Sequence, residues 1–211
     1  MYDETIESLN MKSTLKYLGL VRRDDIKFDI KIYDKKMGKE EYEQLKKITM
    51  QERFNEILKN NEKAIVYFPF ATTATNIYED KEFDEIKKYI SVYTGQYNKD
   101  FKRMSEEDFS SGNTKLMFAT KAFGMGIDIP DINKVHHYAP TGNLNDYVQE
   151  IGRAARSNDI TGIASIDFMN KDFGFVNMLF GMSSIKQYQA KAVLKKIYEI
   201  YFRREKQNFL V

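Results

Sequence analysis

Residues 116–157 read LMFATKAFGMGIDIPDINKVHHYAPTGNLNDYVQEIGRAARS, and two parts of this stretch decide the fold. In the first part, the mostly apolar residues 115–119 run into a glycine-rich turn that contains Gly126 and ends at Asp128. A short apolar run bounded by turn residues predicts a buried strand. Ligands of open α/β sheets bind beyond the carboxyl ends of strands, so Thr120 and the turn are candidates for ligand contacts.

The composition of the turn suits a phosphate or a ribose. Gly126 lets the backbone approach a ligand closely, because no Cβ atom stands in the way. Asp128 has a short side chain that can accept hydrogen bonds from ribose hydroxyls. By itself such a turn is weak evidence, because short glycine motifs recur by chance.

The second part, residues 143–156, has the pattern of an amphipathic helix. Asn143 or Asn145 is the expected N-cap. The apolar residues at helical spacing, which predict one buried face, are Leu144, Tyr147, Val148 and Ile151. Arg153 and Arg156 are three residues apart and therefore neighbours on a helix. Small residues surround them, so the two guanidinium groups could form a fork for phosphate oxygens.

Together the two parts resemble motifs V and VI of superfamily 2 helicases, and the AFGMGI segment is most similar to the RecQ family. The resemblance implies an arginine finger at Arg156, with Arg153 as its companion phosphate ligand. It also implies that Asp128 and Gly126 lie near the ribose of ATP, that Gln149 couples to the other motor domain, and that Thr120 contacts the nucleic-acid backbone. Ala155 stands where the family has glycine, and we expect the geometry to survive this change.

Two further positions resemble nucleic-acid contacts of the family. An apolar run over residues 64–68 predicts a buried strand and is followed by Thr72, in the place of motif IV. Thr72 either contacts the nucleic-acid backbone or caps the next helix, and the cap is the favoured interpretation. A shorter strand, residues 90–93, is followed by Gly95, which partly matches a family motif.

Strands alternate with helices along the rest of the chain. The predicted strands are residues 26–33, 64–68, 90–93, 115–119, 135–139 and 161–168. A helix is expected over residues 39–60, where Thr49 and Glu52 form a capping-box pattern that could divide it in two. This alternation predicts an α/β fold, a RecA-like parallel sheet with helices on both faces.

The expected organisation has three parts. Residues 1–20 are predicted to be a connecting helix that follows the first RecA-like domain. Residues 21–182 are predicted to form the helicase C-terminal RecA-like domain. Residues 183–211 are predicted to form a C-terminal helical extension, since they carry apolar stripes at helical spacing.

Composition excludes several classes of protein. The chain has 211 residues, a net charge of +2 and no cysteine, so disulfides and thiolate metal sites are excluded. No metal site is predicted, because His136 and His137 are adjacent on a strand and should point to opposite faces. No apolar run of 18 residues is present. We therefore expect no membrane partner and a cytoplasmic location.

The sequence contains no P-loop of the form G-x-x-x-x-G-K-[ST] and no acidic motif II. We therefore expect the second motor domain of a longer protein, with ATP bound between two RecA-like domains and Mg²⁺ held by the first. The expected partners are that first domain and single-stranded nucleic acid, with DNA favoured over RNA. The chain alone should be inactive. An RNA-dependent ATPase and a RecA-like scaffold module are the alternatives.

Overall fold

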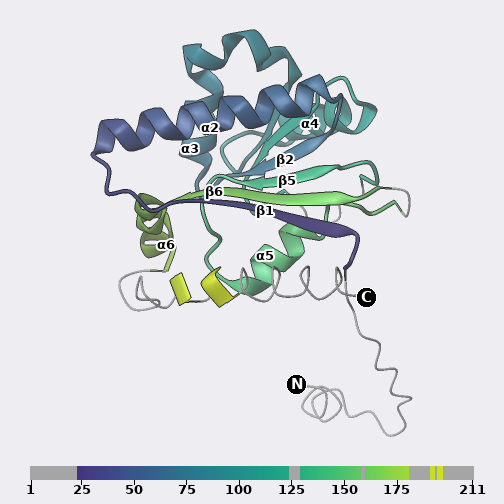
Figure 1. Ribbon diagram of the computed structural model, residues 1–211. Helices are drawn as coiled ribbons and strands as arrows, with labels where there is room; N and C mark the ends of the chain where they lie inside the picture. Colours follow the sequence, from purple (N-terminus) through teal and green to yellow (C-terminus); the bar gives the residue numbers. More distant parts are fainter. Residues whose placement is uncertain (1–22, 124–128, 158–159, 181–190, 193, 197–211) are drawn as a thin grey trace, which may run out of the picture.

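The computed structural model describes residues 23–123, 129–157, 160–180, 191–192 and 194–196 (Figure 1). Its centre is a six-stranded sheet with the order β1-β6-β5-β2-β4-β3, in which every neighbouring pair is parallel. The strands are β1 (Ile26–Tyr33), β2 (Ala64–Tyr67), β3 (Ile90–Tyr93), β4 (Leu116–Ala119), β5 (Lys134–His137) and β6 (Gly162–Met169). Every predicted strand is present, within one or two residues at each end.

Helices cover both faces of this sheet, as predicted for a RecA-like fold. The α-helices are α2 (Lys39–Lys59), α3 (Ala71–Glu79), α4 (Lys99–Ser111), α5 (Leu144–Ile151) and α6 (Phe173–Phe180). Two 3₁₀ helices are also present, η1 (Lys81–Tyr89) and η2 (Asn170–Asp172). Figure 1 shows α2 and α5 on opposite sides of the sheet.

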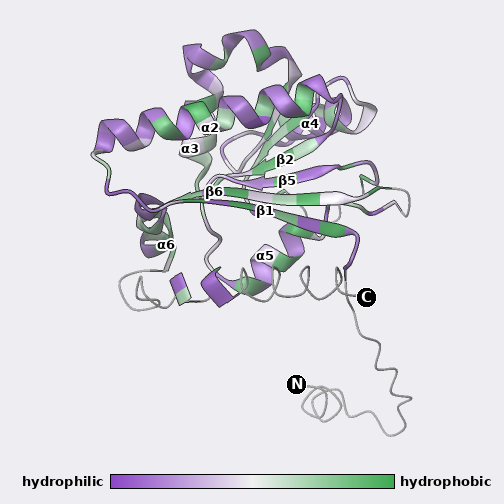
Figure 2. Cartoon of the chain, viewed as in Figure 1, coloured by the Kyte–Doolittle hydropathy of each residue, from purple (hydrophilic) through white to green (hydrophobic). Residues whose placement is uncertain are grey.

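The side chains of the central strands alternate between two hydrophobic cores. Val66 and Phe118 face the core that α2, α3 and η1 complete. Ile65 and Met117 face the core that α4 and α5 complete. In Figure 2 β2 is largely hydrophobic, whereas β5 and much of α2 are hydrophilic. Alternation with both faces covered explains why β2 and β4 read as continuous apolar runs.

Helix α2 is a single helix, so the predicted division at Thr49 is wrong. The Thr49 hydroxyl donates to the Lys46 carbonyl one turn earlier instead of capping a new helix. The buried face of α2 is not purely apolar. It includes Lys46 and Arg53, whereas Ile48 is exposed.

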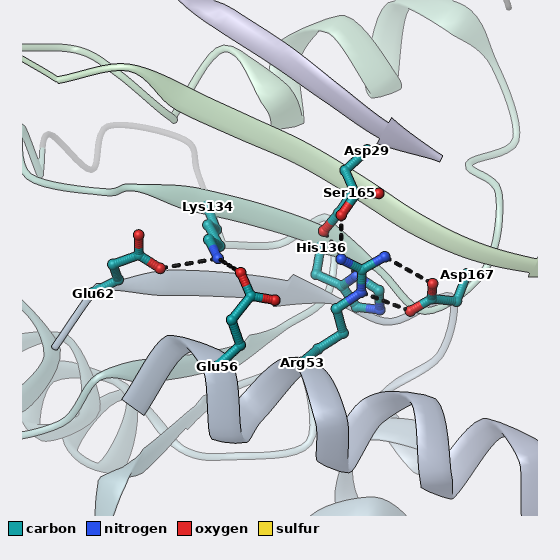
Figure 3. A network of polar contacts seen from close by, with 8 residues as sticks. All are labelled: Asp29, Arg53, Glu56, Glu62, Lys134, His136, Ser165 and Asp167. Carbon is teal, nitrogen blue, oxygen red and sulfur yellow. Dashed lines mark hydrogen bonds and ion pairs between the residues drawn. The ribbon is translucent and has the colours of Figure 1, made fainter. Parts of the chain in front are cut away.

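The buried charges of α2 are paired with acids from distant strands. The Arg53 guanidinium donates to both oxygens of Asp167 at 2.9 and 2.8 Å, and also to Asp29 (Figure 3). The Lys46 ammonium lies 2.9 Å from Asp172, which is fully buried. These ion pairs fix α2 on the sheet, because a buried charge is tolerated only when it is paired.

The terminal segments fall largely outside the described residues. The predicted connecting helix, residues 1–20, lies wholly outside them. Of the predicted C-terminal extension, residues 191–192 and 194–196 are helical, and Lys191 lies 3.2 Å from Asp34 after β1. Within the part of the chain that the structure describes, no helix is long and apolar enough to cross a membrane.

Candidate functional site

The candidate site lies at the carboxyl edge of the sheet, between β2 and β5. From β2 the chain crosses to β3 on one side, and from β5 it crosses to β6 on the other. Neighbouring strands whose connections leave in opposite directions create a crevice at their carboxyl ends. A pocket of about 230 Å³ lies there. Its lining includes Tyr67, Lys121, His137, Asp146 and Glu150.

A buried histidine and a buried glutamate join α5 to β5 in this pocket. His137 Nε2 lies 2.8 Å from Glu150 Oε2, and both residues are less than a tenth exposed. The His137 ring stacks on Tyr67 on one side and packs against Tyr147 on the other, with ring centroids 5.6 and 5.0 Å away. Burial raises the pKa of Tyr147 to about 12. The pair fixes the rotation of α5 about its own axis.

Both motif VI arginines act on the same end of β2. Burial raises the pKa of the Tyr67 phenol above its ordinary value. The positive charges of Arg153 and Arg156 work against this rise, whereas the negative charge of Glu150 adds to it. The Tyr67 hydroxyl donates to the Phe123 carbonyl at 3.1 Å, just before the glycine turn. Tyr67 therefore joins the end of β2 to the start of the predicted motif V.

The predicted helix over residues 143–156 is too long, because α5 ends at Ile151. Asn143 is its N-cap, as predicted, and accepts a hydrogen bond from the Asp146 amide. Arg153 and Arg156 therefore lie in the turn beyond α5 and are not neighbours on a helix. Arg153 is half-buried, while Arg156 is exposed.

Distant contacts fix the turn beyond α5. Ala155 has a φ of 53°, in the left-handed region, and its amide donates to the Ile132 carbonyl at 3.1 Å. The Arg23 guanidinium donates to the carbonyls of Ala154 and Ala155, at 3.0 Å each. Glycine adopts this conformation with least strain, which accounts for the family's preference at this position. These contacts hold the turn with alanine in the left-handed conformation.

The predicted apolar face of α5 is wrong in two of its four members. Leu144 and Val148 are 61% and 55% exposed. Ile151 is buried and Tyr147 is half-buried, as predicted. The helix is rotated because Glu150, not Val148, faces the sheet and reaches His137.

Part of motif V lies outside the described residues, including Gly126 and Asp128. Thr120 is half-buried directly after β4, and its carbonyl accepts a hydrogen bond from the Phe123 amide at 2.8 Å. Lys121, an unusual charge for this motif, forms an ion pair of 2.7 Å with Asp146 on α5. Motif V is thus tied to the motif VI helix.

The remaining predicted contacts are exposed. Thr72 is the second residue of α3 and Gly95 follows β3, so both lie at the carboxyl edge of the sheet. Thr72 is not the N-cap, because Phe70 occupies that position without a side-chain hydrogen bond. Gln149 is exposed on α5.

Sequence reasoning missed Arg23, Tyr67, His137 and Glu150 as parts of the site. Arg23 carries no motif, and its role depends on two carbonyls more than a hundred positions away. Among the described residues, no three histidines, cysteines or acids are grouped to hold a metal ion.

A six-stranded parallel RecA-like sheet, with the segments predicted to be motifs V and VI beside β4 and β5, is the fold of the second domain of a superfamily 2 helicase. A family model described as the helicase conserved C-terminal domain matches residues 40–158. This chain belongs to that family, and it is RecQ-like.

Two relatives and one solved structure illustrate the similarity. The ATP-dependent DNA helicase RecQ of Bacillus subtilis is 33% identical over 153 residues, which cover 70% of this chain and 25% of that protein. The ATP-dependent rRNA helicase SPB4 of Candida albicans is 30% identical over 109 residues, covering 46% of this chain and 17% of that protein. The structure of S. cerevisiae Dbp5 bound to RNA and ADP BeF3 has a TM-score of 0.60 and 20% identity, covering 94% of this chain and 51% of that one.

These matches span only part of each relative. In the first five curated relatives the matched region covers 10% to 25% of the protein. At 20% identity, the likeness to Dbp5 bears on the fold alone.

Proposed function

We propose that this chain is the second motor domain of an ATP-dependent DNA helicase or translocase. The observation that carries the proposal is that Arg153 and Arg156 lie in one turn beyond α5, which contacts from Ile132 and Arg23 hold in place. Two cations in one place suit a substrate with several negative charges. The left-handed turn that holds Arg156 in an exposed position supports the same role, since a finger must reach a partner domain.

In this proposal the bound nucleotide is ATP, held between this chain and the first RecA-like domain. Arg156 acts as the arginine finger on the γ-phosphate, and Arg153 is its companion ligand. An arginine in this position contributes about 10³–10⁵ in rate. Asp128 and Gly126 lie near the ribose, and Gln149 links the two domains. Mg²⁺ belongs to the first domain.

Single-stranded DNA is the proposed track, with movement from 3′ to 5′. Thr120, Gly95 and Thr72 contact its backbone at the carboxyl edge, where parallel strands present their ligand contacts. The RecQ relatives support DNA as the polymer. The chain alone neither hydrolyses ATP nor moves, because it lacks a P-loop.

An RNA-dependent ATPase is the second candidate function. The similarity to an rRNA helicase of Candida albicans favours it. Both candidates use the same arginines and the same sheet edge, so they differ only in the polymer that stimulates turnover.

The test is ATP hydrolysis by the full-length parent with no polymer, with single-stranded DNA or with single-stranded RNA. We expect DNA to stimulate turnover and Arg156→Ala to abolish the stimulated rate. Stimulation by RNA alone would move the assignment to the second candidate. If neither polymer stimulates and Arg156→Ala is silent, the chain is a scaffold module.

A further inference from the structure

A pair of stacked aromatic rings, Tyr97 half-buried and Phe101 exposed, lies at the carboxyl edge, beside the proposed backbone contacts. Tyr97 precedes α4 and Phe101 lies in its first turn. Their ring centroids are 4.3 Å apart and their planes differ by 20°. Phe101 is 38% exposed, so one face of its ring packs on Tyr97 while other parts of the ring reach solvent.

The pair is held rigidly in place. Tyr97 packs against the hydrophobic core under α3, and its amide donates to the Thr94 carbonyl. The Asn98 side chain accepts a hydrogen bond from the Phe101 amide at 2.9 Å, which fixes the start of α4. The preceding loop is tied to α3 by a hydrogen bond of 3.1 Å between Thr75 and Gln96. A ring that is already ordered loses little conformational entropy when a ligand stacks on it.

The charge of α4 changes sign along its length. Its first five residues include Lys99, Lys102 and Arg103 against one acid, Asp100. The following turn carries three acids, Glu106, Glu107 and Asp108. The end of α4 that carries Phe101 is therefore the end that attracts a polyanion.

A chain of contacts joins this end of α4 to motif V. The Lys102 ammonium lies 5.7 Å from the centroid of the Tyr93 ring, over its face. The Tyr93 carbonyl accepts a hydrogen bond from the Thr120 amide at 3.4 Å. Phe101 is thus next to a cation that neighbours the proposed backbone contact at Thr120.

We propose that Phe101, supported by Tyr97, is a stacking platform for one base of single-stranded DNA, and that Lys102 binds an adjacent phosphate. The inference rests on the proposed function, because it places the base beside the backbone contacts of that function. An aromatic face accepts any base, and stacking changes affinity by about 5-fold to 150-fold per base when the ring is removed. The platform supplies grip without sequence preference, which a motor moving along DNA requires.

The experiment measures binding of the chain to three fluorescein-labelled oligomers of equal length by anisotropy at low salt. The oligomers are oligo-dT, an abasic deoxyribose oligomer with the same phosphates, and oligo-U. The variants are Phe101→Ala, Phe101→Tyr, Lys102→Ala and the matched control Met104→Ala, an exposed apolar residue on the same helix. Thermal unfolding establishes that each variant is folded.

We expect Phe101→Ala to weaken oligo-dT binding by ~5-fold or more while binding of the abasic oligomer stays unchanged. Phe101→Tyr and Met104→Ala should bind like the wild type, and Lys102→Ala should weaken both deoxyribose oligomers alike. The platform is refuted if Phe101→Ala weakens both equally, or neither, or weakens oligo-U alone. If the wild type binds no oligomer at all, the proposed DNA function fails together with the platform.

Discussion

The ion pair between Arg53 and Asp167 gives the sharpest stability prediction. Arg53→Met removes two hydrogen bonds of 2.9 and 2.8 Å to a carboxylate that is 1% exposed (Figure 3). Methionine keeps most of the aliphatic stem that packs under α2. The main loss is therefore electrostatic, because the Asp167 carboxylate remains buried without its partner.

Breaking one side of a buried ion pair costs about 3–5 kcal/mol of unfolding free energy. With a urea m-value of about 2 kcal/mol per M, the midpoint should fall by ~1.5–2.5 M. Asp29 adds little to this figure, because its side chain is 42% exposed and water can replace the arginine. A domain with typical stability of about 5–15 kcal/mol would lose a large part of it.

The assay is urea unfolding of the chain, followed by circular dichroism. Arg103→Met is the matched control, since its ion pair with Glu107 is exposed on both sides and should contribute less than ~1 kcal/mol. The double variant Arg53→Met with Asp167→Leu should recover at least ~2 kcal/mol, because no charge is then left buried. A loss below about 1 kcal/mol for Arg53→Met, or a double variant as unstable as the single one, would refute the reasoning.

Two other perturbations test the packing and titration of the same domain. Gly162→Ala would bring a Cβ atom to 2.8 Å from that of Ala154, so we expect a loss of about 1–3 kcal/mol in urea unfolding. Gly174→Ala, which meets no atom within 4 Å, should stay within ~1 kcal/mol, and equal losses in the two variants would contradict this. Burial, together with the positive charges of Arg53 and Lys46, holds the pKa of His136 well below 6.5. The unfolded chain then takes up a proton that the folded chain does not, so stability is complete above pH 6.5 and declines as the pH falls. Between pH 7.5 and 5.0 the wild type should lose more stability than His136→Asn, by at most about 2 kcal/mol, and an equal loss in both proteins would contradict the assignment.

The strand pattern was predictable because it depends on local composition. Central strands such as residues 64–67 are buried on both faces and therefore read as apolar runs. The opposite orientations of His136 and His137 also followed from the two-residue period of a strand. His136 Nδ1 lies 3.0 Å from Ser165 Oγ on β6, whereas His137 Nε2 lies 2.8 Å from Glu150 Oε2 on α5.

The end of α5 and its rotation could not be predicted in this way. The helix stops at Ile151 because the following turn is held by Ile132 and Arg23, and neither contact has a local signal. The spacing of apolar residues predicted that Val148 is buried, because such a pattern considers apolar side chains only. The structure instead buries Glu150, whose partner is thirteen residues earlier in the chain.

The burial of charged residues on α2 could not be predicted from local sequence either. Lys46 and Arg53 are buried because Asp172 and Asp167 neutralise them, and these acids lie more than a hundred positions away. At the candidate site, the roles of Arg153, Arg156, Gln149 and Thr120 stay predictions.

The central claim is that Arg156 stabilises the transition state of ATP hydrolysis on a partner domain. The most direct measurement is DNA-stimulated turnover and nucleotide affinity of the full-length parent, for the wild type, Arg156→Ala and the control Lys59→Ala, an exposed cation in the last turn of α2. We predict that Arg156→Ala lowers kcat by about 10³-fold or more, with nucleotide affinity changed far less, because a finger acts on charge that develops during the reaction. A kcat within tenfold of the wild type, or a loss confined to nucleotide affinity, would contradict the account.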